Sequence, residues 1–327
     1  MKNTSSYSPL LLALLLVLTI TSCDKFEEGV IQEIPFPDHI PELTATLIVN
    51  DQDDKIFAQI SSSAAVLDIE GPQPVQGAVV TLTDEAGQTL YALSESDFDD
   101  PVYILDLAST FGTTTGMTTL TVDAPGFEQI TATNTMPSKP MFDVSYEYQG
   151  DSTSLGGPPI QDVYTIDFDN NLGAKKNYLI HIDGLYLDID TIRIESALYP
   201  EGVNTSTQEW RTMRFQTRTD PRITRLTSLD ESSVIMVSDE SSSSAVSALH
   251  DVQILTKSIP EDSEWAPIST RVRVESLSPE LARYYLSVDS YLSGGLDFFA
   301  EPSLMYSNVS SGFGCFGLAS EDIFIVE

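Results

Sequence analysis

The chain of 327 residues carries 16 Lys and Arg against 49 Asp and Glu, which gives a formal net charge of −33 at pH 7. Such a charge repels phosphates, so it excludes nucleic acid as a partner and excludes attachment to anionic membrane surfaces through basic side chains. The length is sufficient to bury a hydrophobic core and suggests roughly two domains.

Residues 10–20 form an apolar stretch after the positive Lys2, with the length of a signal-peptide core and too short to span a bilayer as a finished helix. Small residues and then Cys23 follow directly (ITSC at 20–23). This resembles a lipobox, where a signal peptidase cuts before a lipid-modified cysteine. We expect residues 1–22 to be a lipoprotein signal peptide and Cys23 to carry the lipid. The alternatives are an ordinary secretory signal with a chance cysteine, or an uncleaved anchor.

Residues 23–42 are polar, contain several prolines and show no hydrophobic period, so they are interpreted as an acidic tether. Asp24, Glu27 and Glu28 at its start resemble the acidic signal that sends lipoproteins of the Bacteroidota to the cell surface. The expected location is therefore the outer membrane, with a lipid anchor. We expect the protein to face the cell surface, with the periplasmic face as the alternative.

From residue 43 onward, apolar residues alternate with polar ones over short runs, and Gly, Pro and Asp turns separate these runs. This pattern predicts an Ig or transthyretin-like β-sandwich over residues 43–137. The predicted strands are 44–49, 56–60, 77–83, 88–93, 102–107, 118–122 and 128–133. A proline-bounded linker follows at residues 136–140.

Residues 141–327 are also mostly β, so the predicted fold class is all-β, with a second, larger β-sandwich and one C-terminal helix. Here the predicted strands are 142–148, 163–168, 178–182, 191–198, 211–217, 233–238, 251–256 and 271–277. Residues 241–244 are four consecutive serines and are interpreted as a flexible loop.

A single helix is predicted near residues 279–293. Ser278 suits the N-cap, Pro279 the first helical position and Glu280 the first turn. Apolar residues then recur at spacings of three and four, namely Leu281, Tyr284, Tyr285, Val288 and Leu292. We expect this helix to pack across a sheet, with Leu281 and Leu292 in the core and Tyr284 beside the centre of the buried face.

No catalytic constellation is found, and neither a serine-hydrolase elbow, a zinc-protease motif, a phosphate-binding glycine loop nor a paired-cysteine metal motif occurs. His39, His181 and His250 are dispersed, and His181 is expected on the solvent face of an apolar strand. The run from Asp167 begins like a calcium loop, but Leu172 stands where glycine is required. No cofactor is expected.

Two acidic loop tips, Asp51, Asp53 and Asp54 in one and Asp97, Asp99 and Asp100 in the other, could hold calcium weakly. Asp is also the ordinary residue of turns, and this interpretation is favoured. With Cys23 lipidated, Cys315 has no partner for an internal disulfide. We expect Cys315 to lie buried and unreactive in the core, between Phe313 and Phe316.

Three segments resemble one family: residues 77–87 (GAVVTLTDEAG), residues 120–137 ending in Thr-Met-Pro, and the block from residue 277 to 317. Together they are similar to the domain-of-unknown-function family 4249 of Bacteroidota outer-membrane lipoproteins. The resemblance runs from about Leu43 to the chain end, although residues 184–250 carry no family signature. It implies an accessory lipoprotein that works near TonB-dependent transporters, and no catalytic residue is carried over. The most specific part of the block contains Glu301, Pro302, Tyr306, Asn308, Gly312 and Gly314.

This last block also has a physical interpretation. Glu301 and Pro302 should begin an extended segment, and residues 306–308 should end a strand, with Asn308 bonding back to the backbone. The glycines, including Gly312 and Gly314, should let the chain pass tightly under the sheet. We therefore expect a structural motif rather than a ligand site.

The favoured function is a surface-exposed lipoprotein that acts as a binding or accessory subunit, partnered with a TonB-dependent transporter and held to the membrane by its N-terminal lipid. A structural or adhesive surface module is the alternative. A hydrolase that uses scattered acidic pairs is the third possibility, and the fold class alone does not choose among them.

Overall fold

A computed structural model describes the protein, and nearly all described residues belong to one compact unit, Pro41–Glu327. The predicted signal peptide, Cys23, the serine loop 241–244, Glu301 and Pro302 lie outside the described residues. These residues are 39–65, 68–96, 102–112, 116–148, 161–169, 176–192, 203–217, 220–226, 229, 234–238, 249–257, 267–294 and 304–326.

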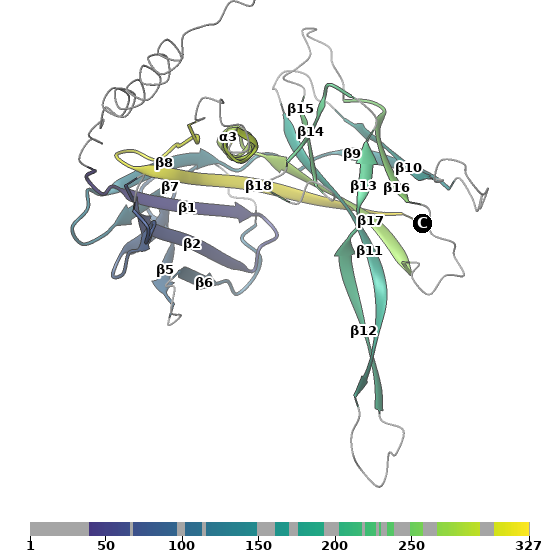
Figure 1. The fold of residues 1–327 in the computed structure, drawn as a ribbon, viewed down its shortest axis with the longest axis horizontal. Coiled ribbons are helices and arrows are strands. Elements are labelled where there is room, and N and C mark those ends of the chain that lie inside the picture. Colours follow the sequence, from purple (N-terminus) through teal and green to yellow (C-terminus); the bar gives the residue numbers. More distant parts are fainter. Residues whose placement is uncertain are drawn as a thin grey trace, which may run out of the picture. The chain divides into compact units, whose positions relative to one another are not determined.

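The described chain is mostly β, as predicted, with one α-helix near the C-terminus (Figure 1). The helix α3 spans Pro279–Gly294, which confirms the expected element. The first-half strands are β1 (Leu43–Asn50), β2 (Lys55–Ser62), β3 (Gln73–Pro74), β4 (Val79–Thr83), β5 (Thr89–Glu95), β6 (Tyr103–Asp106), β7 (Met117–Asp123) and β8 (Ile130–Thr135). The later strands are β9 (Phe142–Glu147), β10 (Gln161–Phe168), β11 (Asn177–Ile192), β12 (Val203–Thr212), β13 (Phe215–Thr217), β14 (Ile223–Arg225), β15 (Ile235–Ser238), β16 (Val252–Lys257), β17 (Ser269–Leu277) and β18 (Phe313–Val326).

The strands form two sheets. The larger follows the order β14-β15-β11-β17-β18-β1-β2-β6-β5-β4-β7-β8, with β12 added beside β11 and β3 beside β2. The smaller has four strands in the order β13-β16-β10-β9.

The last strand, β18, connects the two halves of the large sheet. Its first half runs parallel to β1, from Phe313 opposite Thr44 to Ala319 opposite Asn50. Its second half runs antiparallel to β17, ending with Val326 opposite Thr270. A strand from the predicted second domain therefore completes the sheet of the predicted first domain.

Alternation along the strands builds two separate cores. In β1 the residues at positions 43, 45, 47 and 49 are buried and those between them are half-buried. They pack with apolar residues of β2, β4, β7 and β8, and with Phe316 and Leu318 of β18. The second core lies between the four-stranded sheet and the strands β11, β15 and β17, and it includes Tyr164, Ile182 and Val272.

Helix α3 covers a third, smaller cluster. The Ser278 hydroxyl accepts the Leu281 backbone N–H at 3.4 Å, as expected of an N-cap, and Leu281 is fully buried. Leu292 is 50% exposed, so the expectation that it is a core residue is wrong. The cluster under the helix consists of residues near its first half, including Leu179 and Leu277, and does not extend under its last turn.

Three further local expectations are wrong. His181 is buried rather than on the solvent face, because β11 is flanked by β15 and β17 and charged side chains cover its outer face. Cys315 is buried as expected, but Phe313, at the first position of β18, is 49% exposed. Residues 306–308 do not end a strand: Asn308 bonds β18 through its side chain, and Tyr306 bonds Ser287 of the helix.

The predicted strands 178–182 and 191–198 are also corrected, since one strand of 16 residues, β11, covers residues 177–192. The part of the second predicted strand after residue 192 lies outside the described residues. Strand β12 was not predicted before residue 211, and it pairs with β11 over ten positions. No helix in the described part of the chain is long and apolar enough to cross a membrane.

Candidate functional site

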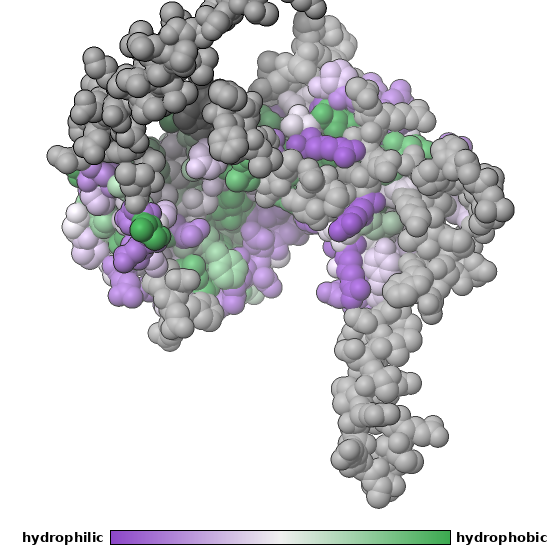
Figure 2. All heavy atoms as spheres, in the orientation of Figure 1, coloured by the Kyte–Doolittle hydropathy of each residue, from purple (hydrophilic) through white to green (hydrophobic). Residues whose placement is uncertain are grey.

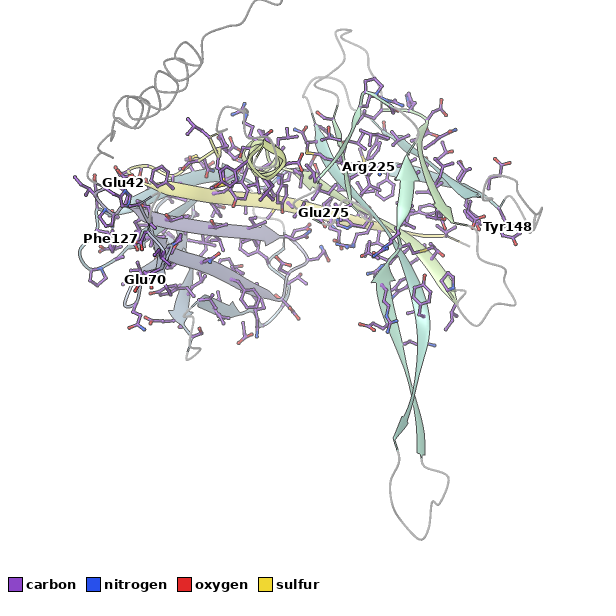
Figure 3. All side chains as sticks on the ribbon, in the orientation of Figure 1. Glu42, Glu70, Phe127, Tyr148, Arg225 and Glu275 are labelled. Atoms are coloured by element: carbon purple, nitrogen blue, oxygen red, sulfur yellow. The ribbon has the colours of Figure 1, made fainter. Side chains whose placement is uncertain are left out.

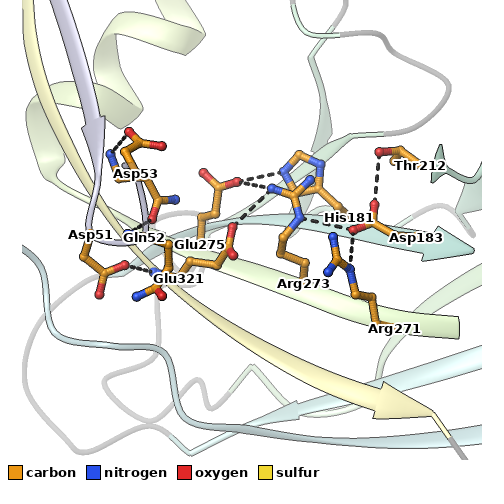
Figure 4. Close-up of polar contacts among 11 residues, drawn as sticks. Asp51, Gln52, Asp53, His181, Asp183, Thr212, Arg271, Arg273, Glu275 and Glu321 are labelled. Atoms are coloured by element: carbon orange, nitrogen blue, oxygen red, sulfur yellow. Dashed lines mark hydrogen bonds and ion pairs between the residues drawn. The ribbon is translucent and has the colours of Figure 1, made fainter. Parts of the chain in front are cut away.

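A row of charged side chains lies on one face of the neighbouring strands β11 and β17. His181 and Asp183 of β11 stand opposite Arg273 and Arg271 of β17. Residues at alternate positions share a face, and the intervening residues, such as Ile182, belong to the second core. The alternation therefore places the charges on the face that points away from this core. Figure 4 shows these side chains and their contacts.

Short contacts join this row into a connected set of ion pairs. Arg271 Nε lies 2.9 Å from Asp183 Oδ2, and Arg273 Nε lies 3.3 Å from the same oxygen. Arg273 Nη1 reaches Glu275 Oε1 at 3.0 Å and Glu321 Oε2 at 3.2 Å. His181 Nε2 lies 3.2 Å from Glu275 Oε1. We call these six residues the charge cluster: His181, Asp183, Arg271, Arg273, Glu275 and Glu321.

Burial and pairing act in opposite directions on the carboxyl groups. Burial raises the pKa of Glu275, but hydrogen bonding to His181 and the charges of His181 and Arg273 outweigh it, so this pKa is lowered. The pKa of Asp183 is lowered in the same way, against burial, by Arg273 and Arg271. Glu321 differs, because burial, together with the charge of Glu275, raises its pKa despite Arg273. The two arginines thus compensate two carboxylates well and the third poorly.

Asp51 extends the cluster toward β1. It is fully buried, so it is not an exposed loop tip, and its carboxylate accepts the Ser320 hydroxyl at 2.8 Å and the Glu321 backbone N–H at 2.9 Å. Its own N–H donates to the Ala319 carbonyl at 3.0 Å. The turn after β1 is thereby fixed to β18 at the point where β18 changes partner from β1 to β17.

The residues of the charge cluster form a network of contacts that suits a structural role. The carboxylates and guanidinium groups are paired with one another, and the structure places no described serine or cysteine in hydrogen-bond contact with His181. A nucleophile beside a base is what covalent catalysis requires. What the arrangement does is hold β11, β17, β18 and the β1–β2 turn together.

Two residues of the predicted C-terminal motif, Asn308 and Tyr306, hydrogen-bond to neighbouring elements. The Asn308 side chain accepts the Phe316 N–H and donates to the Phe316 carbonyl, both at 2.9 Å, as a strand neighbour would. Asn134 of β8 donates to the same carbonyl at 2.8 Å and to Ser278 Oγ at 2.9 Å. Tyr306 donates its N–H to Ser287 Oγ at 2.8 Å, and the Arg283 guanidinium lies over its ring.

The motif glycines lie against β1. A Cβ on Gly312 would lie 2.3 Å from the Leu43 carbonyl oxygen, and one on Gly314 would lie 1.9 Å from that of Ala45. Gly314 also has a φ of 122°, which L side chains rarely adopt. Only glycine therefore lets β18 approach β1 this closely.

The acidic turns do not assemble a metal site in the part of the chain that is described, where no group of three or more His, Cys, Asp or Glu side chains is placed to hold an ion. Asp53 Oδ2 accepts the Asn50 N–H at 2.7 Å. Asp167 Oδ1 accepts the Asp251 N–H at 2.8 Å, as a turn residue does. The tip at residues 97–100 lies outside the described residues.

Sequence reasoning missed the charge cluster, although one signal was present. Charges alternate with apolar residues along residues 271–275 (RVRVE) and residues 181–183 (HID). This indicates two strands with a charged face each, but only the pairing of β11 with β17 shows that these faces meet.

Comparisons with known proteins give one match at the level of sequence. The family described as Domain of unknown function (DUF4249) matches residues 35–323. No protein with a curated description matches the chain.

Solved structures show only a faint likeness. Trypsin-activated alpha-2-macroglobulin from Escherichia coli has 10% identity and a TM-score of 0.22, covering 76% of this chain and 15% of that one. Salmonella alpha-2-macroglobulin reacted with methylamine has 9% identity and a TM-score of 0.21, covering 89% of this chain and 15% of that one. The full-length major pilin SpaD from Corynebacterium diphtheriae has 9% identity and a TM-score of 0.20, covering 90% of this chain and 67% of that one. The chain thus spans about 15% of the length of these macroglobulins, and TM-scores at this level do not establish a shared fold.

Proposed function

Because the chain belongs to the DUF4249 family, whose function is unknown, we propose a function from its own residues. In this proposal the protein is a lipid-anchored accessory or binding protein of the bacterial outer membrane, exposed at the cell surface and partnered with a TonB-dependent transporter. The observation that carries this proposal is Cys23, which directly follows an apolar run of signal-peptide length.

Charge and chemistry support the proposal. A net charge of −33 leaves the lipid, and not basic residues, as the means of membrane attachment. The charged groups of the charge cluster pair with one another, which favours a structural role for them.

A candidate contact surface lies at the end of helix α3. Tyr291 is 51% exposed, and Leu304 and Met305 are 91% and 54% exposed. The bond from Tyr306 N–H to Ser287 Oγ holds the segment beginning at Leu304 against the helix. On the face drawn in Figure 2, hydrophilic and hydrophobic residues are mixed. A group of exposed large apolar residues favours a protein contact.

The anchor is tested by replacing Cys23 with Ala in the full-length protein. We expect the variant to lose processing and to leave the outer-membrane fraction, because no other residue can take the lipid. A Cys23→Ala protein that is processed normally and still fractionates with the outer membrane would overturn the proposed location.

The partner is tested by pull-down from detergent-solubilised outer membrane, followed by mass spectrometry. We expect a transporter with wild-type protein and its loss with the double variant Tyr291→Ser and Leu304→Ser. Phe57→Ser is the matched control, because Phe57 is 52% exposed on β2, in the other half of the sheet. Equal recovery of the transporter by both variants would exclude this contact surface, and absence of any transporter would exclude the partnership.

A further inference from the structure

The second core ends in a group of polar and aromatic side chains, Asp162, Tyr146, Tyr164 and Thr256, which we call the Asp162 mouth. Along β10, Tyr164, Ile166 and Phe168 are buried and face the core. Asp162 lies two positions before Tyr164 and so shares this face. It stands opposite Thr256 of β16, which is fully buried. The apolar core therefore gives way to a carboxylate and a hydroxyl in its last row.

Asp162 is a buried carboxylate whose hydrogen-bond partner is the phenol of Tyr146 and, among the described residues, not a cation. The residue is 7% exposed, and its Oδ1 makes no hydrogen bond. It takes part in no ion pair, within the described ranges, of the kind that neutralises Asp183 in the charge cluster. Burial of an unpaired charge is costly, so buried carboxylates are normally paired with a cation. The unbonded oxygen in this structure therefore points to a missing partner.

Tyrosines surround this carboxylate. The rings of Tyr146 and Tyr164 lie 5.0 Å apart, and the charge of Asp162 acts on both phenols. Burial, with a smaller effect of Asp162, raises the pKa of Tyr164 to about 12, so this phenol stays neutral. Tyr146 is 39% exposed and connects the mouth to solvent. Tyr148, just after the end of β9, acts on the Tyr146 phenol and is labelled in Figure 3.

The opposite sheet contributes to the same mouth. Tyr186 of β11 and Thr270 of β17 both lie close to Tyr164. A Cβ on Gly184 would lie 2.8 Å from the Tyr186 ring, so the absence of a side chain lets this ring lie against the strand. Arg211, the cation that acts on Tyr186, is 51% exposed and pairs with Glu209 at 3.0 Å.

We propose that this mouth, formed by Asp162, Tyr146, Tyr164 and Thr256, binds an organic ammonium group. A primary ammonium neutralises the carboxylate, donates to its unbonded oxygen and is attracted by the faces of the tyrosine rings. A neutral sugar hydroxyl would satisfy the oxygen but leave the charge unpaired, and an anion would be repelled. The small exposed fraction of Asp162 suits a narrow head group, and the net charge of −33 attracts cations to the surface.

The test is isothermal titration of the purified protein without its signal peptide, with n-butylammonium chloride as the probe. We expect saturable binding, and Asp162→Asn should weaken it by about tenfold or more, since the charge partner is lost. Asp143→Asn is the matched control, because Asp143 is an exposed carboxylate of the adjacent strand β9, and it should bind as wild type. Thermal melting and circular dichroism check that each variant is folded.

Further experiments distinguish the role of the Tyr146 ring from that of its hydroxyl, and identify which kind of molecule supplies the ammonium group. Tyr146→Phe removes the hydroxyl that hydrogen-bonds Asp162 but keeps the ring, so it should retain binding, whereas Tyr146→Ala should weaken it, because the ring face is the contact. Saturable binding of Nα-acetyl-lysine amide would assign the group to a protein side chain, and binding of butylammonium alone would assign it to a small amine. The proposal would be overturned if Asp162→Asn bound butylammonium as tightly as wild type, or if wild type showed no saturable binding. It would also be overturned if sodium chloride competed for the site as well as butylammonium does. None of these results depends on the lipid anchor or on the transporter.

Discussion

Leu281 offers a quantitative test of how helix α3 is held. It is fully buried and packs in a cluster with Leu179, Met236 and Leu277. A Cβ on Gly317 would lie 2.6 Å from Leu281 Cδ1, so the leucine lies directly against the β18 backbone. Replacement of a buried Leu by Ala costs about 2–5 kcal/mol, depending on how far the site can collapse. Strands fixed by sheet pairing collapse little, so we expect about 3–5 kcal/mol for Leu281→Ala.

Leu292→Ala in the same helix is the control, because it is the same substitution at a position that is 50% exposed. It should cost less than about 1 kcal/mol, since half of the side chain is already in water. Urea denaturation, followed by circular dichroism, gives the free energy of unfolding of both variants. We expect the dependence of this free energy on urea concentration to equal that of the wild type. Equal losses for the two variants would refute the packing described for the helix. An unchanged Leu281→Ala protein that fails to bind its partner would show that the helix face is a docking surface.

Four further expectations follow from the buried groups. Arg273→Met should lower the free energy of unfolding by about 3–5 kcal/mol, measured by urea denaturation, because it leaves buried carboxylates unpaired. The lowered pKa values of Asp183 and Glu275 stabilise the fold above the unfolded pKa of about 4, and this contribution should vanish as the pH falls through the folded values. Glu321 has a raised pKa, so Glu321→Gln should gain stability over wild type as the pH rises above about 4.3, in parallel denaturation curves. Cys315 should react slowly with a small thiol reagent in the native protein, because burial raises its pKa to about 12, and rapid labelling would contradict its burial.

Local patterns predicted the elements whose residues are neighbours in sequence. Alternation predicted β1, and the three- and four-residue spacing after Ser278 predicted α3 almost to its ends. The same reasoning failed at Leu292, because periodicity says which residues share a face but not where the covering sheet ends. It failed at His181 because a strand histidine looks alike in the sequence whether its face is exposed or covered by charged side chains.

The middle of β11 shows why the sequence predicted two short strands where the structure has one long strand. Asp183 and Gly184 stand between two apolar runs, and both residue types are common in turns. In the structure Asp183 is held in the sheet by Arg271, 88 residues away, and Gly184 accommodates the Tyr186 ring. Contacts between residues this far apart in the sequence cannot be inferred from the pattern of neighbouring residues. Neither the charge cluster nor the Asp162 mouth could therefore be predicted.

The C-terminal block illustrates the limit of inference from a family-like motif. If Asn308 served a ligand, its amide would be available to solvent, yet both its oxygen and its nitrogen bond the Phe316 backbone. If Gly314 left room for a ligand, the space beside it would be open, yet the Ala45 carbonyl fills it. These residues instead let a strand from the end of the chain lie parallel to β1 at its beginning. The most specific sequence signature therefore reports how the sheet is joined. A ligand is better sought where a polar group lacks a partner, as at Asp162.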